Sequence, residues 1–564
     1  MAHWAKFAAD MLCEGGRPPV CASGITPSGE FHLGHLREIL TAEMIHRSCI
    51  DWFDGYGQDG KSNYIFIVDS MDPLRRVYDF LSPSYEEFIG HPLAFIPAPM
   101  EDGAPGPKPQ EGGKSYAEHF LQDFIVALEQ LGISFPSDGE SNNGYKMIMN
   151  HRTYEDGEYA KLTDLAIRNK DKIRDKIEEV SGRELPKDWY PYNPVSSYNG
   201  SMDGVLVSGY EWPYVHWEDP QGREGKSDIR KAEGKMPWRV EWAARWIIHG
   251  ITCEPAGKDH GSAGGSYDTG HPIYEILCRE MPEKNDFQPP RKMVYEWIQL
   301  KGMGPMSSSA GVSIGPLEAL KIVPPEILRY LIARTRMARH IDFDTGGKLF
   351  EIADEYERMR DFVSIEGDEM EELQDDMSNR QYENFLKDRQ AIELSKVNPN
   401  SSIGDYIGAV SFRHLSMLAQ IKKSDGEIWK SLEQTSHISG EAHEGLKDRL
   451  RRMRAWIDGA HFPEEAKIEI RAQFDNSGSE KLVVGASGFL LELSESLKDC
   501  EWNDQVIDDC IRLVARTTEM QIRDAYSTLY EVILGKSHGP KVSSLIFHIG
   551  RSEVRYLFES VQMD

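Results

Sequence analysis

The first third of the chain alternates short apolar runs with stretches in which apolar residues recur every three or four positions. Residues 18–23, PPVCAS, lead into an apolar run, and Leu36, Ile39, Leu40 and Met44 then follow at helical spacing. This order predicts a buried strand that leads, through a turn, into a helix.

The same alternation continues along the next hundred residues. Residues 64–70, YIFIVDS, form a strand-like run that contains Asp69, and residues 115–133 have the spacing of an amphipathic helix. Residues 101–114, EDGAPGPKPQEGGK, are rich in Pro and Gly and indicate an exposed loop. Strands that alternate with helices predict an α/β fold with a parallel sheet.

In the remainder of the chain the sequence pattern changes twice. Residues 145–183 are charged and helical in pattern, whereas residues 185–236 are rich in Tyr, Trp, Pro and Gly and indicate short strands and turns. A strand-like run, MVYEWIQL, returns at residue 293, and helical periodicity dominates from about residue 318 onward. We therefore expect an insertion between two halves of the α/β domain, followed by a helical region.

Composition restricts the class of protein further. A chain of 564 residues is too long for a single compact core. The net charge of −28 disfavours a generally basic surface that binds nucleic acid. Seven scattered cysteines form no CxxC pair, and no apolar run approaches the roughly 20 residues that span a bilayer. The first residues show no cleavage-type ending, so we expect a cytoplasmic protein without a membrane segment.

Two histidines stand where the first strand meets the first long helix, in GITPSGEFHLGHLREIL (24–40). In a parallel α/β sheet this position binds phosphate-bearing ligands, because helix N-termini offer amide donors there. His32 and His35 could donate hydrogen bonds to a phosphoryl group, and Gly34 would let a flat base approach the backbone. HxGH is a short pattern, and two ordinary histidines at a helix start are the competing interpretation.

A Gly-rich stretch with three serines, LKGMGPMSSSAG (300–311), follows the last predicted strand. Its backbone amides and hydroxyls could bind phosphate oxygens. By itself, such a composition more commonly indicates a plain Gly/Ser loop.

Taken together, HLGH and MSSS resemble the paired HIGH and KMSKS elements of class I aminoacyl-tRNA synthetases. The stretches DSMDPLRRV, MPWRVEWAARW and especially AGKDHGSAGGSYDTG (256–270) resemble class I lysyl-tRNA synthetase, the archaeal-type enzyme. The resemblance covers essentially the whole chain. It implies a Rossmann-type catalytic domain with an inserted subdomain, followed by an all-helical anticodon-binding domain. The implied boundaries are 1–136, 137–236, 237–317, 318–345 and 346–564.

The resemblance implies a ligase that activates L-lysine with ATP and Mg²⁺ and transfers it to tRNA(Lys). The matching positions fall into three groups. The catalytic positions are His32, His35, Met306, Ser307, Ser308 and Ser309. The nucleotide-binding positions are Gly34, Gly257, Asp259, Gly264 and Gly265. The lysine-pocket positions are Gly24, Thr26, Trp238, His260, Tyr267 and Asp268.

Several of these positions have ordinary structural alternatives. Asp259 could simply cap a loop, and Trp238 could be a core residue, because PWRVEWAARW contains three tryptophans. An ammonium substrate needs a carboxylate or an aromatic face, and both are present. The sequence leaves open which carboxylate meets the ε-ammonium of lysine.

The sequence departs from the family pattern in two places. Lysines usually flank the MSxS loop, but Pro305 and Ala310 occupy those positions here, and Ser308 takes the inner lysine position. Either Mg²⁺ and another base such as Lys301 compensate, or activation is slow. The inserted region also lacks the cysteines of a zinc ribbon, so we predict no structural zinc.

Two basic clusters are candidates for contact with tRNA. Arg329, Arg334, Arg336 and Arg339 follow the MSSS loop, and KDRLRRMRAW (447–456) lies in the helical half. An ordinary charged helix face is the competing interpretation of the second cluster.

Three other functions remain open at this level. The chain could be another class I synthetase, for glutamate or cysteine. It could be a small-molecule nucleotidyltransferase, although the helical extension has no role there. It could also be a degenerate paralogue that binds tRNA without forming an adenylate.

Overall fold

The computed structural model describes residues 2–561 except 15–17, 58–60, 137–143, 282–287, 301–303, 306–313, 366–372, 375, 402–409, 441–442 and 476–481. These residues form two compact units. The first comprises residues 1–320, 328–343 and 366–399, and the second comprises 321–327, 344–365 and 400–564. Each unit is described by itself below, and the predicted domain boundaries stay predictions.

A parallel sheet organises the first unit. Strands β1 (Val20–Ile25), β2 (Asn63–Val68) and β3 (Tyr145–Met149) pair in the order β1-β2-β3. Single parallel bridges from Cys21 to Cys253 and from Cys253 to Arg291 extend the sheet beyond β1. The chain order across the sheet therefore reverses next to β1, as in doubly wound folds, and ligands bind at such a reversal.

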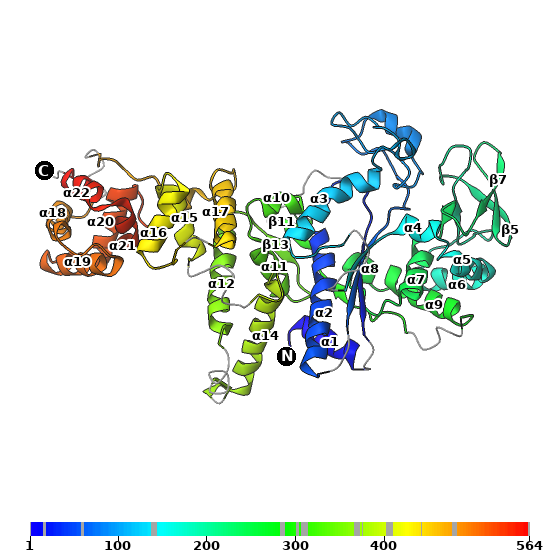
Figure 1. Cartoon of the computed structure of the whole chain (residues 1–564), viewed down its shortest axis with the longest axis horizontal. Helices are drawn as coiled ribbons and strands as arrows, with labels where there is room; N and C mark the ends of the chain where they lie inside the picture. Colours follow the sequence, from blue (N-terminus) through cyan, green and yellow to red (C-terminus); the bar gives the residue numbers. More distant parts are fainter. Residues whose placement is uncertain are drawn as a thin grey trace. The chain divides into compact units, whose positions relative to one another are not determined.

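Helix α2 (His35–Gly55) follows β1 (Figure 1), and most of its residues are buried. It packs against α1 (Trp4–Cys13) as well as β1 and β2. Its buried face also includes a charged residue that has partners: Glu43 accepts hydrogen bonds from Tyr145 at 3.0 Å and Arg329 at 2.8 Å. Such pairing permits a charged residue to remain inside a protein.

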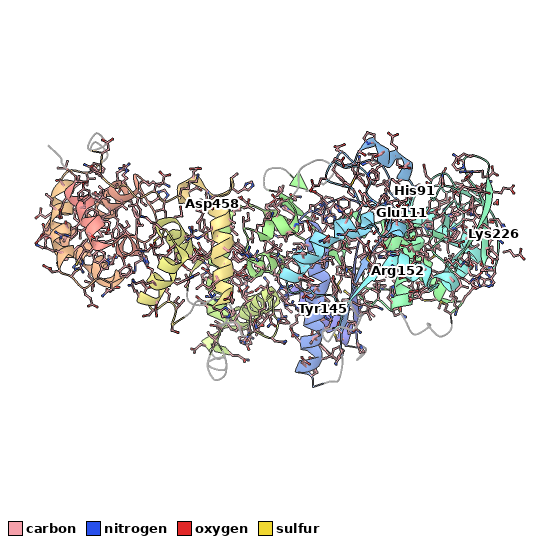
Figure 2. The ribbon with its side chains drawn as sticks, turned by 45° about the horizontal axis from the view of Figure 1, so that its top comes forward. His91, Glu111, Tyr145, Arg152, Lys226 and Asp458 are labelled. Atoms are coloured by element: carbon pink, nitrogen blue, oxygen red, sulfur yellow. The ribbon has the colours of Figure 1, made fainter. Side chains whose placement is uncertain are left out.

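The inserted region consists of helices and a small antiparallel sheet. Helices α4 (Asn150–Glu155), α5 (Ala160–Arg168) and α6 (Lys170–Ser181) precede strands β5 (Leu206–Glu211), β6 (Tyr214–Glu218) and β7 (Glu224–Asp228). Figure 2 labels Lys226 on this sheet. Its ammonium lies 4.3 Å from the centre of the Tyr214 ring. The short strands predicted for residues 185–236 are therefore confirmed.

The sheet's second half is formed by shorter elements. Helix α7 (Trp238–His249) leads to β9 (Ala256–Gly257), α8 (Lys258–Gly261) and α9 (Ser266–Cys278). Helices α5, α6 and α7 pack with α9 (Figure 1). The strand predicted from residue 293 is split into β10 (Val294–Tyr295) and β11 (Ile298–Leu300), because Glu296 and Trp297 leave the ladder.

Two strands occur where only helices were predicted. Residues Tyr145–Met149 form β3 rather than the start of a helix, and Ile341–Phe343 form β13, parallel to β11. Both segments are short, and β3 contains a lysine, so their period-two signal is weak. The remaining helices of this unit are α3 (Tyr116–Gln130), α10 (Pro316–Leu320), α14 (Asn379–Ser395) and most of α11 (Pro325–Ala333).

The second unit is helical, as predicted. Its core contains a cluster of aromatic rings, in which Phe350, Phe412 and Phe462 surround the buried Trp456. Its helices are α12 (Gly347–Val363), α15 (Phe412–Ile421), α16 (Asp425–Gln434), α17 (Glu444–Ile457), α18 (Ala486–Lys498), α19 (Asp504–Thr517), α20 (Ile522–Leu534), α21 (Val542–Ile549) and α22 (Arg551–Glu559).

Each predicted basic cluster includes an arginine that is buried and ion-paired inside the protein. Arg329 is fully buried and paired with Glu43, so it cannot contact tRNA, whereas Arg334, Arg336 and Arg339 lie beyond the end of helix α11 and are exposed. In α17, Arg449 is buried and pairs with Glu326 and Glu357. Burial removes Arg329 and Arg449 from the candidates for tRNA contact, because the sequence shows charge but not the acidic partner.

No helix within the described ranges is long and apolar enough to cross a membrane.

Candidate active site

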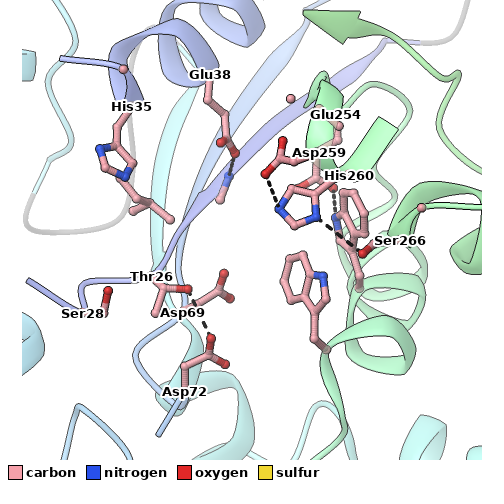
Figure 3. A pocket seen from close by; sticks show the side chains of 18 of the residues that line it. Thr26, Ser28, His35, Glu38, Asp69, Asp72, Glu254, Asp259, His260 and Ser266 are labelled. Atoms are coloured by element: carbon pink, nitrogen blue, oxygen red, sulfur yellow. Dashed lines mark hydrogen bonds and ion pairs between the residues drawn. The ribbon is translucent and has the colours of Figure 1, made fainter. Parts of the chain in front are cut away.

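A cavity of about 840 Å³ opens where β1, β2 and β9 end in the first unit. Its wall includes the N-terminal turns of α2 and α7, so residues far apart in sequence meet there (Figure 3). Most of the site residues predicted from sequence line this cavity. They are Gly24, Thr26, His32, Gly34, His35, Trp238, Gly257, Asp259, His260 and Gly265.

The two histidines of HLGH lie together at the start of α2. Their ring centres are 4.0 Å apart, and burial lowers the pKa of His32 to about 4 and of His35 to about 3. Both imidazoles are therefore neutral at pH 7, and each can donate one hydrogen bond. The His32 ring lies close over Gly34, where an added Cβ would be 2.7 Å from it.

Asp259, His260 and Ser266 form a polar row on another wall of the cavity (Figure 3). His260 Nε2 lies 3.5 Å from Asp259 Oδ2, and its Nδ1 lies 3.4 Å from the Ser266 hydroxyl. Asp259 also lies close to Gly257, where an added Cβ would approach its Oδ1 to 2.5 Å. A side chain at Gly257 would therefore displace this carboxylate.

Glu38 lies one turn into α2 and projects into the cavity (Figure 3). Its Oε1 accepts the Gly24 amide at 3.0 Å, and its Oε2 accepts the Tyr295 hydroxyl at 3.2 Å. Burial raises the pKa of this carboxyl to about 8. No cation among the described residues forms an ion pair with it, so the site holds a carboxylate that lacks a counter-charge.

The floor of the cavity contains further buried carboxyl groups. Burial raises the pKa of Asp69 to about 7, although Arg245 pairs with it and opposes the shift. Burial also raises the pKa of Glu254, which accepts the indole N–H groups of Trp242 at 2.8 Å and Trp246 at 2.6 Å. A Cβ at Gly24 would face Arg245, Asp69 and Glu254, so glycine keeps this space free.

Asp72 and Lys235 form a buried ion pair of 2.5 Å beside Thr26. Burial by itself would raise the pKa of Asp72, but Lys235 holds it below its ordinary value. The Thr26 hydroxyl donates to Asp72 at 3.2 Å. Thr26 is thus fixed by an ionised carboxylate on the floor of the cavity.

Aromatic rings complete the wall. Trp238 stacks on Trp242 with a centroid distance of 5.0 Å, and His260 lies about equally far from both rings, at 6.0 and 5.9 Å. Both tryptophans and His260 line the cavity. A ligand with an aliphatic chain and a cationic end would find an apolar face beside the carboxylates.

The comparisons with known proteins agree over the full chain. The family model described as tRNA synthetases class I (K) matches residues 2–387, and the model described as Anticodon binding domain matches residues 417–556. The lysine--tRNA ligase of Picrophilus torridus is 32% identical over 561 residues and covers 99% of both chains. The chain belongs to the class I lysyl-tRNA synthetases.

Two further members of the family show the same level of similarity. The lysine--tRNA ligases of Thermoplasma acidophilum and Archaeoglobus fulgidus are each 34% identical and cover 99% and 98% of both chains. Membership confirms the predicted resemblance, the α/β fold with a helical C-terminal part, and ligase chemistry that consumes ATP.

Some residues matched to the family motifs lie away from the cavity wall. Among the described residues, Tyr267 is fully buried and donates to the carbonyls of Pro290 and Arg291 at 2.9 and 2.8 Å. Asp268 accepts from Lys292 at 2.6 Å and from the Gly264 amide at 3.1 Å. Met306, Ser307, Ser308 and Ser309 fall outside the described residues, as does Lys301.

The synthetase cavity also contains residues that sequence reasoning missed. Glu38, Asp69, Glu254 and Tyr295 line it, but none was singled out as a site residue. Asp69 was visible at the end of a predicted strand, a position where parallel sheets bind ligands. Glu38 and Tyr295 are 257 residues apart, and only the folded sheet brings them together.

No group of three or more His, Cys, Asp or Glu residues in the described part of this synthetase is arranged to hold a metal ion.

Proposed function

We propose that the cavity is the site at which this synthetase activates L-lysine with ATP and then transfers it to tRNA(Lys), in the cytoplasm. Glu38 receives the ε-ammonium of lysine, with Tyr295 and the Gly24 amide fixing the carboxylate. Trp238 and His260 flank the aliphatic chain, and Thr26 and Gly24 shape the floor. The helical unit binds the anticodon part of tRNA, and the predicted domain boundaries belong to this proposal.

One observation carries the choice of lysine: Glu38 is a carboxyl group inside the cavity that forms no ion pair with a cation of the described residues. Placing a charge there costs free energy unless a cation accompanies it. A ligand ammonium supplies that cation, and the free lysine side chain is protonated at neutral pH because its pKa is about 10.4.

The charge of the cavity separates lysine from the alternative substrates. Five carboxyl groups line it, those of Glu38, Asp69, Asp72, Glu254 and Asp259. Lys235 and Arg245 pair with Asp72 and Asp69 on the floor, whereas Glu254 and Asp259 act on Glu38 as further negative neighbours. Next to Glu38, the side chain of glutamate would be repelled by these carboxyl groups, whereas the ammonium of lysine is attracted.

For adenylate formation we assign the nucleotide to the other half of the cavity. Neutral His32 and His35 donate to the α-phosphate as charge develops in the transition state. Asp259 accepts from the ribose hydroxyls, and Gly34, Gly257, Gly264 and Gly265 let the nucleotide approach the backbone. Mg²⁺ enters with the phosphates of ATP, because it prefers phosphate and carboxylate oxygens.

Met306, Ser307, Ser308 and Ser309 bind the leaving pyrophosphate in this proposal. Pro305 and Ala310 replace two cations of the family pattern. Since fewer charges stabilise the leaving group, we expect adenylate formation to depend strongly on Mg²⁺ and to be slower than in relatives that keep both lysines.

The decisive measurement is lysylation of tRNA(Lys), together with lysine-dependent exchange between ATP and pyrophosphate in the presence of that tRNA. Lysine should support both reactions, and glutamate and cysteine should support neither. Tight tRNA binding without exchange at saturating lysine would indicate a non-catalytic paralogue and would refute the proposal. Exchange with glutamate would refute the assignment of Glu38.

A further inference from the structure

Two arginines line the cavity on the side of Ser266, away from the carboxylate floor. Arg239, in the first turn of α7, donates from Nη1 to the Ser266 hydroxyl at 3.0 Å. Arg183 follows the end of α6 and is exposed at the cavity wall. The pKa of Arg239 is lowered first by burial and then by the positive charge of Arg183, and both side chains line the same cavity.

Neither arginine has an acidic partner in the described part of the chain. The Nε of Arg239 is buried and donates to no acceptor there. This is unusual in a chain with 92 acidic and 64 basic side chains, since Arg75 on the cavity wall and the buried cations Lys235 and Arg245 are all paired with carboxylates. Two unpaired arginines that line one cavity favour the binding of an anion there.

The backbone next to the arginines favours the same kind of ligand. Helix α9 begins at Ser266, and its N-cap, Gly265, makes no side-chain capping bond. The positive end of this helix and its free amide groups therefore lie beside Arg239. Asp268, in the first turn, is engaged with Lys292 and the Gly264 amide.

The position of the arginines indicates whether they bind a phosphate of ATP or a phosphate of tRNA. His35 and Ser266 lie on opposite sides of the cavity (Figure 3). The arginines are therefore remote from the histidines assigned to the α-phosphate of ATP. Arg183 belongs to the segment inserted into the α/β fold, and this segment borders the cavity at Arg183.

We propose that Arg183 and Arg239 form a subsite for a phosphate group, and that this group is the last phosphodiester of the tRNA 3′ end rather than a phosphate of ATP. The proposal rests on the function proposed above. Arg239 holds the phosphate from Nε and Nη1 beside Ser266, and Arg183 closes over it from the insertion. The pair thereby positions the terminal adenosine to attack the lysyl-adenylate.

The test uses the full-length protein and two tRNA(Lys) substrates, one natural and one with an uncharged methylphosphonate as its last linkage. Arg239→Gln and Arg183→Gln should each lower kcat/KM for natural tRNA by about 10- to 100-fold, since each removes a charge-assisted contact. With the unchanged protein, the methylphosphonate should lower kcat/KM by a similar factor. With the Arg239→Gln protein, the methylphosphonate should lower kcat/KM almost no further. Arg239→Lys should recover part of the loss.

Direct binding of ATP provides the second arm, and Arg168→Gln, on the exposed face of α5, is the matched control. We expect ATP affinity within about twofold of the unchanged protein in every variant. The proposal would be overturned if the arginine variants bound ATP more weakly and if their losses in kcat/KM multiplied with the loss caused by the methylphosphonate. The subsite would then be assigned to ATP. Unchanged kcat/KM in both variants would also overturn it. An unchanged protein that forms no lysyl-tRNA would instead refute the proposed function.

Discussion

At pH 7 the carboxyl group of Glu38 is largely protonated in the free protein, because burial raises its pKa to about 8. In the unfolded chain an ordinary glutamate is ionised at this pH. The folded form therefore binds an extra proton between about pH 4.5 and 8, and its stability falls as the pH rises through that window. Glu38 thus opposes folding under the conditions in which it can bind an ammonium group.

The first prediction concerns Glu38→Gln, which keeps the size of the side chain and removes its charge. We expect the KM for lysine to rise at least about 30-fold, because the ammonium loses its buried counter-charge. The substrate-free variant should be more stable than the unchanged protein at pH 8, which thermal unfolding can measure. Glu129→Gln, exposed on α3, should change neither quantity.

The second prediction concerns the proton that Glu38 releases when lysine binds. When lysine binds, the ammonium lowers the pKa of Glu38, so the carboxyl must release its proton at pH 7. Lysine affinity should therefore increase between pH 6 and pH 8 and then level off. Titration calorimetry in two buffers of different ionisation enthalpy should show release of close to one proton at pH 7. Proton uptake, or an affinity that decreases over this range, would contradict the assignment.

Single residues also show where sequence reasoning reached its limit. His32 and His35 were predictable, because residues at a strand–helix junction of a parallel sheet lie at its ligand-binding edge, and the family resemblance pointed to Asp259 and Trp238. Glu38 was not, because in sequence it is one polar position on a long helix. The role that we propose for it depends on Tyr295 and on the lack of an ion-pair partner among the described residues, and both are properties of the folded sheet.

At the scale of elements, α2 is held by polar contacts as well as by its apolar face. Arg329 donates to Glu43 on α2, to the Leu131 carbonyl after α3 and to the Leu394 carbonyl in α14. One buried guanidinium thereby joins three helices of the first unit. This network keeps the N-terminal turn of α2, with its two histidines, in place.

The third prediction follows from this network. Arg329→Met should lower the free energy of unfolding by about 3 to 5 kcal/mol, because Glu43 would remain buried with fewer partners. Urea denaturation followed by circular dichroism measures the change. Arg339→Gln, at an exposed position of the same predicted cluster, should leave stability within about 0.5 kcal/mol. Equal effects of the two substitutions would show that Arg329 has no special structural role.

The elements themselves were predictable to different degrees. Long amphipathic helices such as α3, and buried strands such as β2, have clear periodicity. The strands β3 and β13 were missed, since five and three residues carry little pattern. Pairing with neighbouring strands decides their structure, and that information is not local.

At the scale of the whole molecule, the chain combines a net charge of −28 with a nucleic-acid substrate. The described arginines of α17 are largely committed to carboxylates of their own unit. Helix α17 therefore offers few free guanidinium groups with which to displace counterions from tRNA. We expect the affinity of the protein for tRNA to depend on a small number of phosphate contacts.

The fourth prediction concerns how the affinity for tRNA(Lys) depends on salt concentration. A plot of log affinity for tRNA(Lys) against log salt concentration should have a slope no steeper than about −4, which corresponds to roughly five phosphates or fewer. Filter binding or fluorescence anisotropy over 50–300 mM salt, at about constant Mg²⁺, gives the slope. A slope near −8 would reveal an extensive basic surface and would contradict this interpretation.

The two units are interleaved along the chain, and this affects the order in which they can be completed during synthesis. Residues 321–327 and 344–365 belong to the helical unit, but residues 366–399 belong again to the α/β unit. On the ribosome, the α/β unit cannot be finished until residue 399 has emerged. The packing of Phe350 in helix α12 is completed only when Trp456 emerges, about 100 residues after Phe350, which takes about 5 to 20 seconds at ordinary elongation rates.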